Sequence, residues 1–302
     1  MIIGHKSIIE YFDKVIAAGN LSHAYLLVGP QQVGKSTIAH YLAAKLLHVD
    51  EKKLSIHADF SYVAREKDPK TDKTKKNIDI ARIRELRHFL ELSSEGYKVV
   101  VIDGAQHMSS GAANALLKSL EEPKANAVLF LTTPSEHLVL STIRSRCQKM
   151  YVDPVSDDEL LTSARENNMD ESLVPLARGL PGRFVDFQDE AIRAQTEQST
   201  QAFLNLFGKP YYEKLQLVDE YFGDKTDHIA ARDRLVSILN DWEFLIGQHL
   251  YSTMGVSAEE SAIVCDNATL LKIYDNVQVA KEELQNNIHP KLLVENILLS
   301  IP

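Results

Sequence analysis

The sequence has very little cysteine. Cys147 and Cys265 are the only two cysteines among 302 residues, which excludes a disulfide framework and a zinc site with four cysteine ligands. Long apolar runs are also lacking, because no window approaches the ~20 residues of a transmembrane helix. The opening residues, MIIGHKSIIEYF, lack the basic segment and long apolar stretch of a secretory signal. We therefore expect a cytoplasmic protein with no membrane association, in which Cys147 serves packing and not catalysis.

Clusters of basic residues are scarce as well. The chain has 33 Lys and Arg against 42 Asp and Glu, a net charge of −9. Tight autonomous binding to nucleic acid is unexpected at this charge, because that affinity comes from Lys and Arg contacts to phosphates. A DNA contact shared within a larger assembly is still compatible with it. The length allows two or three domains, and 44% apolar residues are ordinary for a soluble globular protein.

The sequence does contain a phosphate loop over residues 29–36. An apolar run of strand length, residues 25–28, precedes G-P-Q-Q-V-G-K-S, which fits the pattern G-x-x-x-x-G-K-[ST]. The glycines allow a tight turn whose N–H groups converge on phosphate oxygens, and the following helix adds its positive end. Lys35 would reach the β- and γ-phosphates, and Ser36 would be a Mg²⁺ ligand. A chance glycine-rich turn is the alternative, but strand, loop and helix all fall where the motif needs them.

A second strand supplies a candidate magnesium-binding carboxylate. Residues 98–104, KVVVIDG, are nearly all apolar, as expected of a strand buried on both faces of a parallel sheet. The strand ends on Asp103, the usual position of the second Mg²⁺ group in phosphate-loop proteins. An aspartate that merely ends the strand in a turn is the alternative interpretation. Further strands are expected at residues 59–63, 127–132 and 150–152.

The apolar strand pattern stops near residue 153, and helical spacing follows to the end of the chain. Ser156 before three carboxylates is a strong helix start, Pro290 suits the first turn of the last helix, and Ser110 is expected to cap an earlier helix. The predicted fold class is therefore α/β, a parallel sheet flanked by helices, followed by an all-helical region. The predicted domains are a nucleotide-binding α/β domain over residues 1–153, a small helical lid over residues 154–193 and a helical domain over residues 194–302.

Several motifs together are similar to those of a known family. They are, in chain order, IIGHKSII, LSHAYLLVGPQQVGKST, KVVVIDGAQHMS, ANALLKSLEEP, LFLTTP, TIRSRC, ARGLPGR and a final IHPKLLVENILLS. Their succession resembles the bacterial clamp-loader AAA+ subunits of DNA polymerase III, the delta-prime subunits in particular. ANALLKSLEEP followed by TIRSRC is specific to clamp loaders, whereas the phosphate loop alone is not. The resemblance runs through nearly the whole chain and implies an AAA+ phosphate-loop module, a helical lid and a collar that joins five subunits in a ring.

The resemblance also implies partners, cofactors and site residues. The partners would be gamma/tau-like and delta-like loader subunits, the sliding clamp and primer–template DNA reached through the assembly, and the cofactors would be ATP and Mg²⁺. Arg146 in SRC matches the arginine finger, which acts on ATP held by the neighbouring subunit. The residues that match the nucleotide site are Ile2, Ile3 and Gly4 at the adenine pocket, Gly29, Pro30, Gly34, Lys35, Ser36 and Thr37 in the phosphate loop, Asp103 as the magnesium aspartate, Thr132 or Thr133 as the first sensor, and Arg183 as the second sensor that reads the γ-phosphate.

Two departures from the family pattern bear on activity. Motor-type AAA+ proteins carry a glutamate directly after the strand-terminal aspartate to activate water, and this position is Gly104 here. Gln106 and His107 lie close in sequence and are interpreted as residues that lead into the next helix. The family's zinc module is absent, because no cysteine lies between residues 48 and 79, so we expect no zinc site. An intact phosphate loop beside a missing glutamate predicts ATP binding with little or no hydrolysis.

Three functions are compatible with these motifs. The leading hypothesis is a clamp-loader subunit that supplies Arg146 in trans and holds ATP without efficient turnover, so that the chain by itself is at most a weak ATPase. The alternative is an ATP-hydrolysing motor subunit of the gamma/tau type, which Gly104 and the missing cysteines disfavour. A small-molecule phosphotransferase that uses the same loop would explain neither SRC nor the collar-like final hundred residues.

Overall fold

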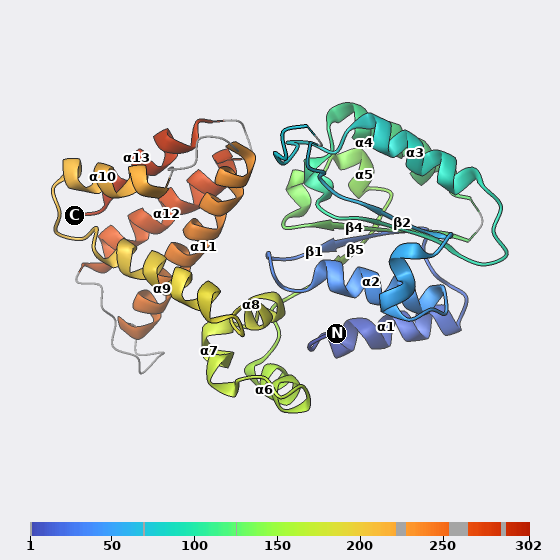
Figure 1. Cartoon of the computed structure of the whole chain (residues 1–302), viewed down its shortest axis with the longest axis horizontal. Coiled ribbons are helices and arrows are strands. Elements are labelled where there is room, and N and C mark those ends of the chain that lie inside the picture. The colour runs from blue at the N-terminus through green and yellow to red at the C-terminus, as the bar shows by residue number, and fades with distance from the viewer. Residues whose placement is uncertain (1, 69, 125, 222–227, 254–264, 285–287) are drawn as a thin grey trace. The chain divides into compact units, whose positions relative to one another are not determined.

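The structure is a computed structural model that describes residues 2–68, 70–124, 126–221, 228–253, 265–284 and 288–302 (Figure 1). Its internal contacts divide the chain into two compact units. The first comprises residues 1–67 and 75–189, and the second comprises residues 68–74 and 190–302. Among the residues that the structure describes, no helix has both the length and the apolar character needed to cross a bilayer.

The first unit is built on a five-stranded parallel sheet with the strand order β2-β3-β4-β1-β5. The three central strands are buried over their whole length, which accounts for their nearly continuous apolar sequences. The predicted fold class, a parallel α/β module followed by helices, is confirmed. The strands are Ala24–Val28 (β1), Phe60–Val63 (β2), Lys98–Ile102 (β3), Ala127–Thr133 (β4) and Gln148–Tyr151 (β5).

Helices cover both faces of this sheet (Figure 1). One face packs against α1 (Lys6–Ala17) and α2 (Lys35–Leu46), around an aromatic group of Phe12, Tyr25 and Phe130. The other face packs against α3 (Ile80–Glu91), α4 (Ser110–Glu121) and the short α5 (Ser141–Arg144). Short 3-10 helices lie at Glu51–Ile56 (η1), Ala105–His107 (η2), Glu136–Leu138 (η3) and Glu171–Leu173 (η4).

The parallel arrangement gives the sheet two chemically different edges. Val28 at the end of β1 pairs with Thr133 at the end of β4, and Ile102 at the end of β3 pairs with Leu131. The residues that follow these strands therefore gather at one carboxyl edge. The start of β5 pairs with the start of β1, through Gln148 and Tyr25, so the segment before β5 lies at the opposite, amino edge.

Two helix starts were expected from serine caps, and one of them is shifted. Ser156 caps α6 (Asp157–Glu166) as predicted, in a capping box with Glu159. The expectation that Ser110 caps α4 is wrong, because the cap is Ser109, whose Oγ accepts a hydrogen bond from the N–H of Ala112 at 3.1 Å. Ser109 keeps the extended backbone of the preceding segment, while Ser110 is already helical.

A small helical layer closes the first unit. It consists of α6, α7 (Val174–Ala177) and α8 (Pro181–Asp186), which share an apolar core with the N-terminal Ile3. The buried members of this core are Ile3, Val155, Leu160, Ala164, Leu173, Val174, Ala177, Phe184 and Phe187.

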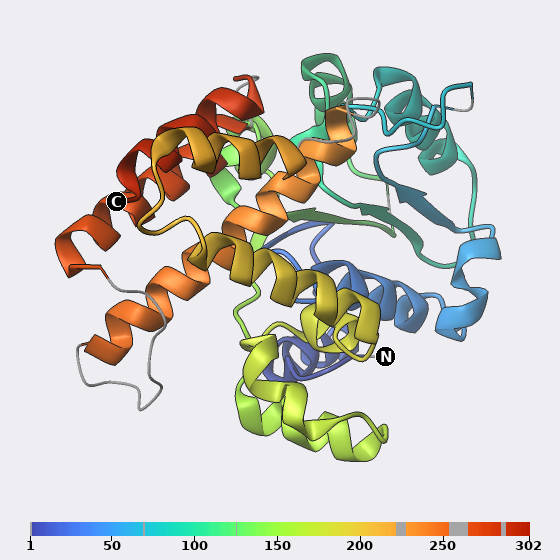
Figure 2. The ribbon, with the colours of Figure 1, turned by 60° about the vertical axis from the view of Figure 1, so that its left-hand side comes forward.

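The regular secondary structure of the second unit is helical and lies within residues 190–302, among the residues that the structure describes. α11 packs against α9 and α12, and α13 packs against α10 and α12 (Figure 2). Pro290 occupies the first turn of the last helix, as predicted. The rings of Phe203 and Trp242 lie 4.8 Å apart at the centre of the core. The helices are Glu190–Leu204 (α9), Tyr211–Tyr221 (α10), His228–Thr253 (α11), Asn267–Glu283 (α12) and Pro290–Ser300 (α13).

Phe203→Ala should lower the free energy of unfolding of the helical unit by about 3–5 kcal/mol, because Phe203 is fully buried and the truncation leaves a cavity. Trp242 is the only tryptophan, so its fluorescence during urea unfolding reports on this unit alone. The control is Leu271→Ala on α12, where the side chain is 48% exposed and the change should stay within about 0.5 kcal/mol. Equal shifts for the two variants would contradict the packing described here.

Candidate nucleotide-binding site

The phosphate loop leaves the carboxyl end of β1 and depends on two glycines. Gly29 lies so close to the neighbouring backbone that a Cβ there would sit 2.1 Å from the carbonyl oxygen of Val152. Gly34 has a φ of +102°, in the left-handed region that glycine adopts without steric cost. α2 begins directly after it at Lys35, so the N–H groups of its first turn are available beside the loop. Together these features form a cradle that suits phosphate oxygens.

His5 supports the loop, a role that no sequence motif indicated. Its Nε2 lies 2.7 Å from the carbonyl oxygen of Val33, and its ring lies 3.6 Å from the point that a Cβ on Gly34 would occupy. Burial lowers the pKa of His5, which favours the neutral imidazole, with Nε2–H as the donor to Val33. Sequence reasoning missed this residue because its partner lies 28 positions along the chain.

Lys35 is folded back onto the loop that precedes it. Its Nζ donates hydrogen bonds to the carbonyl oxygens of Gly29, at 2.8 Å, and Pro30, at 2.6 Å. Burial lowers the pKa of Lys35 to about 8, and the Asp103 carboxylate opposes this shift. A phosphate group can replace the two carbonyl oxygens as acceptor, and its negative charge would favour the ammonium form. Lys35 thus lies against the phosphate loop, and its contact with a phosphate stays a prediction. Thr37 is exposed in the first turn of α2.

Asp103 is the centre of a hydrogen-bond cluster at the carboxyl edge. Its Oδ2 accepts from Ser36 Oγ at 3.0 Å and from the Tyr62 hydroxyl at 2.9 Å. Its Oδ1 accepts from Thr132 Oγ1 at 2.6 Å. Thr133 donates instead to a carbonyl oxygen of its own loop. Of the two candidate sensor threonines, Thr132 is therefore the one that joins this cluster.

Ser36 and Asp103 fit a magnesium ion. Mg²⁺ prefers oxygen ligands and is held in nucleotide sites by one or two protein groups together with phosphate oxygens and water. The hydroxyl and the carboxylate are already within hydrogen-bond distance of each other beside the loop. Within the described ranges, His, Cys, Asp and Glu side chains form no group of three or more that could hold a metal ion by themselves. Phosphate oxygens and water would complete the magnesium shell.

Tyr62 is a second site residue that sequence reasoning missed. It lies on β2, and it reaches Asp103 because β2 pairs with β3. Burial, with Asp103 as the next cause, raises the pKa of Tyr62 to about 12, so the phenol stays protonated and acts as a donor. The His40 ring lies 5.1 Å from the Tyr62 ring, and His40 Nδ1 lies 2.7 Å from the carbonyl oxygen of Ser36. The only sequence signal at Tyr62 was the strand expected at residues 59–63.

Gly104 occupies the position where motor-type AAA+ proteins have a glutamate. Its φ of +80° is left-handed, and a Cβ there would lie 2.8 Å from the His107 ring. Gln106 and His107 follow in the 3-10 helix η2, and their side chains contact each other at 3.0 Å. The local backbone therefore suits glycine and leads directly into a tight turn.

Two hydrogen bonds join α8 of the helical layer to the phosphate loop. The N–H of Gly182 donates to the carbonyl oxygen of Gln32 at 2.7 Å, and Gln32 Nε2 donates to Asp186 at 2.7 Å. Arg183 follows Gly182 in α8; it is buried, and its guanidinium lies 4.9 Å from the centre of the Phe187 ring. The structure thus brings the second-sensor candidate next to the residue that touches the loop. Its contact with a γ-phosphate stays a prediction.

The N-terminal segment predicted to line an adenine pocket packs into the helical layer. Ile3 is buried in its apolar core, and Ile2 is partly exposed. Gly4 has a φ of +69°, and a Cβ there would lie 2.5 Å from Val155 Cγ1. The segment therefore links the α/β core to the helical layer, directly before the His5 contact to the loop.

Arg146 is not brought to this cluster. It precedes β5, and Gln148 pairs with Tyr25 near the start of β1, whereas the phosphate loop follows the end of β1. At about 3.3 Å per residue, the intervening strand separates the two by roughly 13 Å along the sheet. Its guanidinium contacts Glu121 and the carbonyl oxygen of Thr142 instead. Arg146 therefore lies at the amino edge, away from the phosphate loop of its own chain.

Cys147 is buried in the sheet core, and burial raises its pKa to about 12. A thiol with this pKa holds its proton, and a protonated thiol is a poor nucleophile. Its surroundings support the packing role expected from the sequence.

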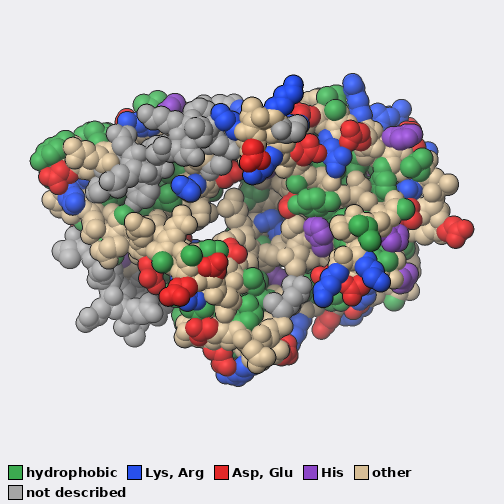
Figure 3. Space-filling view, in the orientation of Figure 1, with side chains coloured by type: hydrophobic (Ala, Val, Ile, Leu, Met, Phe, Trp, Pro, Cys, Tyr) green, Lys and Arg blue, Asp and Glu red, His purple; other side chains and the backbone are tan. Residues whose placement is uncertain are grey.

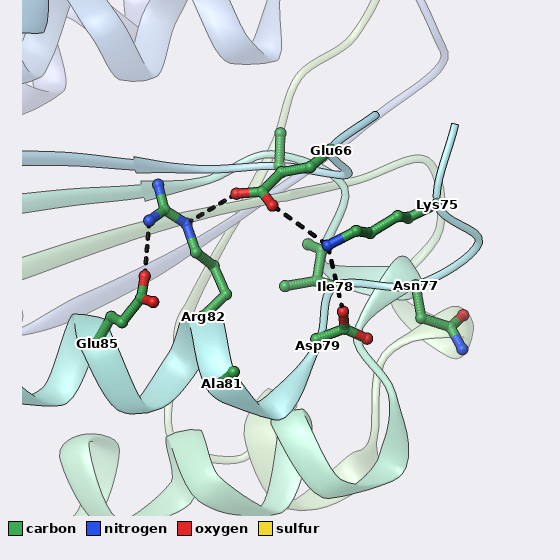
Figure 4. Close-up of a pocket in the computed structure, with 9 residues that line it drawn as sticks. Glu66, Lys75, Asn77, Ile78, Asp79, Ala81, Arg82 and Glu85 are labelled. Carbon is green, nitrogen blue, oxygen red and sulfur yellow. Dashed lines mark hydrogen bonds and ion pairs between the residues drawn. The ribbon is translucent and has the colours of Figure 1, made fainter. Parts of the chain in front are cut away.

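A charged pocket of about 230 Å³ lies between the end of β2 and α3 (Figure 4). Glu66 pairs with both Lys75, at 3.5 Å, and Arg82, at 3.3 Å. Lys75 also pairs with Asp79, and Arg82 also pairs with Glu85. These charged side chains pair with one another. We therefore interpret them as ion pairs that hold the segment lacking the zinc cysteines against α3, and not as a ligand site.

The strand order, the loop and the polar cluster at the carboxyl edge define an α/β phosphate-loop module of the AAA+ class. Residues 4–156, just over half of the chain, match the model of the family described as DNA polymerase III, delta subunit. The chain belongs to this family.

Curated relatives include both delta-prime and gamma subunits. The chain is 36% identical over 142 residues to the delta-prime subunit of DNA polymerase III from Pseudomonas aeruginosa, a match that covers 42% of each chain. It is 30% identical over 189 residues to the gamma subunit from Buchnera aphidicola, which covers 58% of this chain and 52% of the relative. The chain thus spans about half the length of the curated relatives it matches.

Solved structures that the chain matches include a DNA polymerase III gamma subunit-related protein and a RuvB Holliday junction branch migration motor, both from Thermotoga maritima. The first is 20% identical with a TM-score of 0.45, over 95% of this chain and 97% of the other. The second is 14% identical with a TM-score of 0.46, over 92% of this chain and 87% of the other.

Gly182→Ala should lower the free energy of unfolding of the first unit by about 1–3 kcal/mol. A Cβ on Gly182 would lie 2.8 Å from the Gln32 carbonyl oxygen and 3.1 Å from Gln32 Cα, and no side-chain rotation relieves a clash with backbone. The measurement is urea unfolding followed by circular dichroism. The control is Gly111→Ala in α4, where a Cβ would meet Ile80 at an ordinary 3.5 Å, and where the change should be neutral or stabilising by up to ~1 kcal/mol. If both variants behaved alike, the described contact of α8 with the loop would be wrong.

Proposed function

We propose that this chain is a delta-prime-type clamp-loader subunit of DNA polymerase III, which helps to load the sliding clamp onto primed DNA during replication. The observation that carries the proposal is the placement of Arg146 at the amino edge of the sheet, opposite the phosphate loop at the carboxyl edge. An arginine at the amino edge lies too far from the nucleotide site of its own chain to act there, but it is available to the site of a neighbouring chain. Membership of the DNA polymerase III delta subunit family supports the proposal.

In this proposal Arg146 acts in trans as an arginine finger. The guanidinium would stabilise the charge that develops on the phosphoryl group of ATP held by the neighbouring subunit. Because the side chain is 35% exposed, it is accessible to a partner surface.

The chain's own site would bind ATP and Mg²⁺ with little hydrolysis. Gly29, Pro30, Gly34, Lys35, Ser36 and Thr37 would hold the phosphates, Ser36 and Asp103 the magnesium, Thr132 and Arg183 would sense the γ-phosphate, and Ile2, Ile3 and Gly4 would border the adenine. Activation of water needs a proton acceptor aimed at it. The side chains that hydrogen-bond to Asp103 in the described part of the chain are hydroxyl donors, and Gly104 contributes no side chain.

The remaining parts of the chain would serve assembly. In this proposal residues 1–153 form the nucleotide-binding domain and residues 154–193 form the lid. Residues 194–302 form the collar, which joins gamma/tau-like and delta-like subunits in a five-subunit ring. Lys and Arg side chains are interspersed with Asp and Glu on the face shown in Figure 3, and the net charge is −9. Primer–template DNA would therefore be contacted through the assembly and not by this chain alone. The sliding clamp would be a further partner.

The second candidate is a motor subunit of the gamma/tau type. It is favoured by the complete phosphate loop and by the match to a gamma subunit. Gly104 disfavours it for the reason given above, and measured turnover would decide between the two.

We expect the isolated chain to bind a labelled ATP analogue in the presence of Mg²⁺ and to hydrolyse ATP at no more than the background rate. Lys35→Ala should abolish binding, because it removes the charge that reaches the phosphates. Lys45→Ala is the matched control, since Lys45 lies on the same helix but pairs with Asp13, and it should bind normally. Robust turnover that is lost in Lys35→Ala would favour the motor candidate. Absence of binding would remove ATP from the proposal.

Arg146→Ala should leave the chain folded and able to assemble, yet lower the ATPase rate of the complete loader. Arginine fingers are worth ~10³ or more in rate in other phosphoryl-transfer systems. Arg144→Ala is the control, because Arg144 faces Glu136 at 4.0 Å and lies outside the SRC motif. Equal losses in the two variants would indicate a folding defect, and an unchanged rate in Arg146→Ala would remove the finger from the proposal.

A further inference from the structure

The Arg146 guanidinium is held by contacts from two different segments of the chain. Its Nη1 donates to the carbonyl oxygen of Thr142 at 2.9 Å and to Ser145 Oγ at 3.3 Å, both close in sequence. Its Nη2 lies 2.8 Å from Oε1 of Glu121. The guanidinium is thus fixed on two of its nitrogens, although the side chain is 35% exposed.

Glu121 comes from another element than Arg146. It is the last residue of α4, which packs against α5, the helix just before Arg146. The next residue, Glu122, lies along a different pocket of about 450 Å³, lined also by Arg87 and Lys118. Of the two adjacent glutamates in ANALLKSLEEP, the first therefore contacts Arg146 and the second faces elsewhere.

An arginine that acts on a phosphate needs a defined position. The guanidinium recognises phosphate through a planar fork of N–H groups, and a misplacement of about 1 Å can cost ~10²-fold in rate. A flexible side chain at an exposed site does not hold such a position by itself. Supporting hydrogen bonds from neighbouring groups reduce its freedom before the partner arrives.

We propose that Glu121 is a positioning residue for Arg146, which fixes the guanidinium in the orientation presented to a nucleoside triphosphate on a neighbouring chain. The inference rests on the trans-acting role of Arg146 proposed above. The trans-acting role of Arg146 thus depends on the Glu121 carboxylate of α4, and the functional unit is the Arg146–Glu121 ion pair. Thr142 and Ser145 restrain one guanidinium nitrogen, and Glu121 restrains the other.

The first test uses the complete loader assembled with wild-type or variant chain. Glu121→Gln should lower kcat for ATP by about two- to tenfold, the range expected when an exposed ion pair that orders a reacting group is lost. KM for ATP should change little, because an arginine finger stabilises the charge of the transition state and not bound ATP. Assembly by size exclusion should be unchanged. Glu122→Gln removes the same charge from the adjacent residue and should have no effect.

The double variant separates positioning from a merely structural role. If Glu121 acts only through Arg146, adding Glu121→Gln to Arg146→Ala should cause no further loss. An additional loss in the double variant would overturn the inference, and so would a normal kcat in Glu121→Gln beside a low kcat in Arg146→Ala. Should Arg146→Ala itself retain full activity, the finger assignment would fail, and the positioning role would fail with it.

A second measurement on the isolated chain does not depend on assembly or activity. The ¹⁵N signals of the Arg146 guanidinium are identified as those that disappear in Arg146→Ala. In the wild-type chain these signals should show restricted rotation of the Nη groups. Glu121→Gln should give the averaged signal of a free guanidinium, and Glu122→Gln should not. Unaltered restriction in Glu121→Gln would show that Thr142 and Ser145 suffice, and would overturn the inference.

Discussion

The carboxylate of Asp103 is the group on which the site depends. It accepts hydrogen bonds from Ser36 at the start of α2, Tyr62 on β2 and Thr132 on β4, while Asp103 itself follows β3. One partly buried carboxylate therefore joins four elements at the carboxyl edge of the sheet. This carboxylate provides the oxygen atoms that a magnesium ion prefers.

The two edges of the sheet divide the chemistry of the chain. The carboxyl edge carries the phosphate loop, supported by His5 and fastened to α8 through Gln32. The amino edge carries Arg146, restrained by the end of α4. Parallel strands enforce this division, because every strand ends at the first edge and begins at the second. A chain built in this way can bind nucleotide on one edge and act on a neighbour's nucleotide from the other, which is the physical basis of the clamp-loader proposal.

Several parts of the fold followed directly from sequence pattern. The apolar runs at β1, β3 and β4 were recognisable because a strand covered on both faces excludes polar residues. The capping box of Ser156 and Glu159 is local chemistry within one helical turn. The cap of α4 was misplaced by one residue, since two adjacent serines offer the same hydroxyl and only the backbone conformation of Ser109 distinguishes them. The strand order was not available, because periodicity carries no information about which strands pair.

The sequence by itself determined the phosphate loop, since its glycines, Lys35 and Ser36 lie within eight consecutive residues and their spacing implies their geometry. It also determined that Gly104 stands directly after Asp103. Only the tertiary structure decided that Tyr62 and Thr132 bind Asp103, that His5 supports the loop and that Glu121 holds Arg146. These contacts join residues far apart in the chain, and they exist because the sheet and its helices bring them to a common edge.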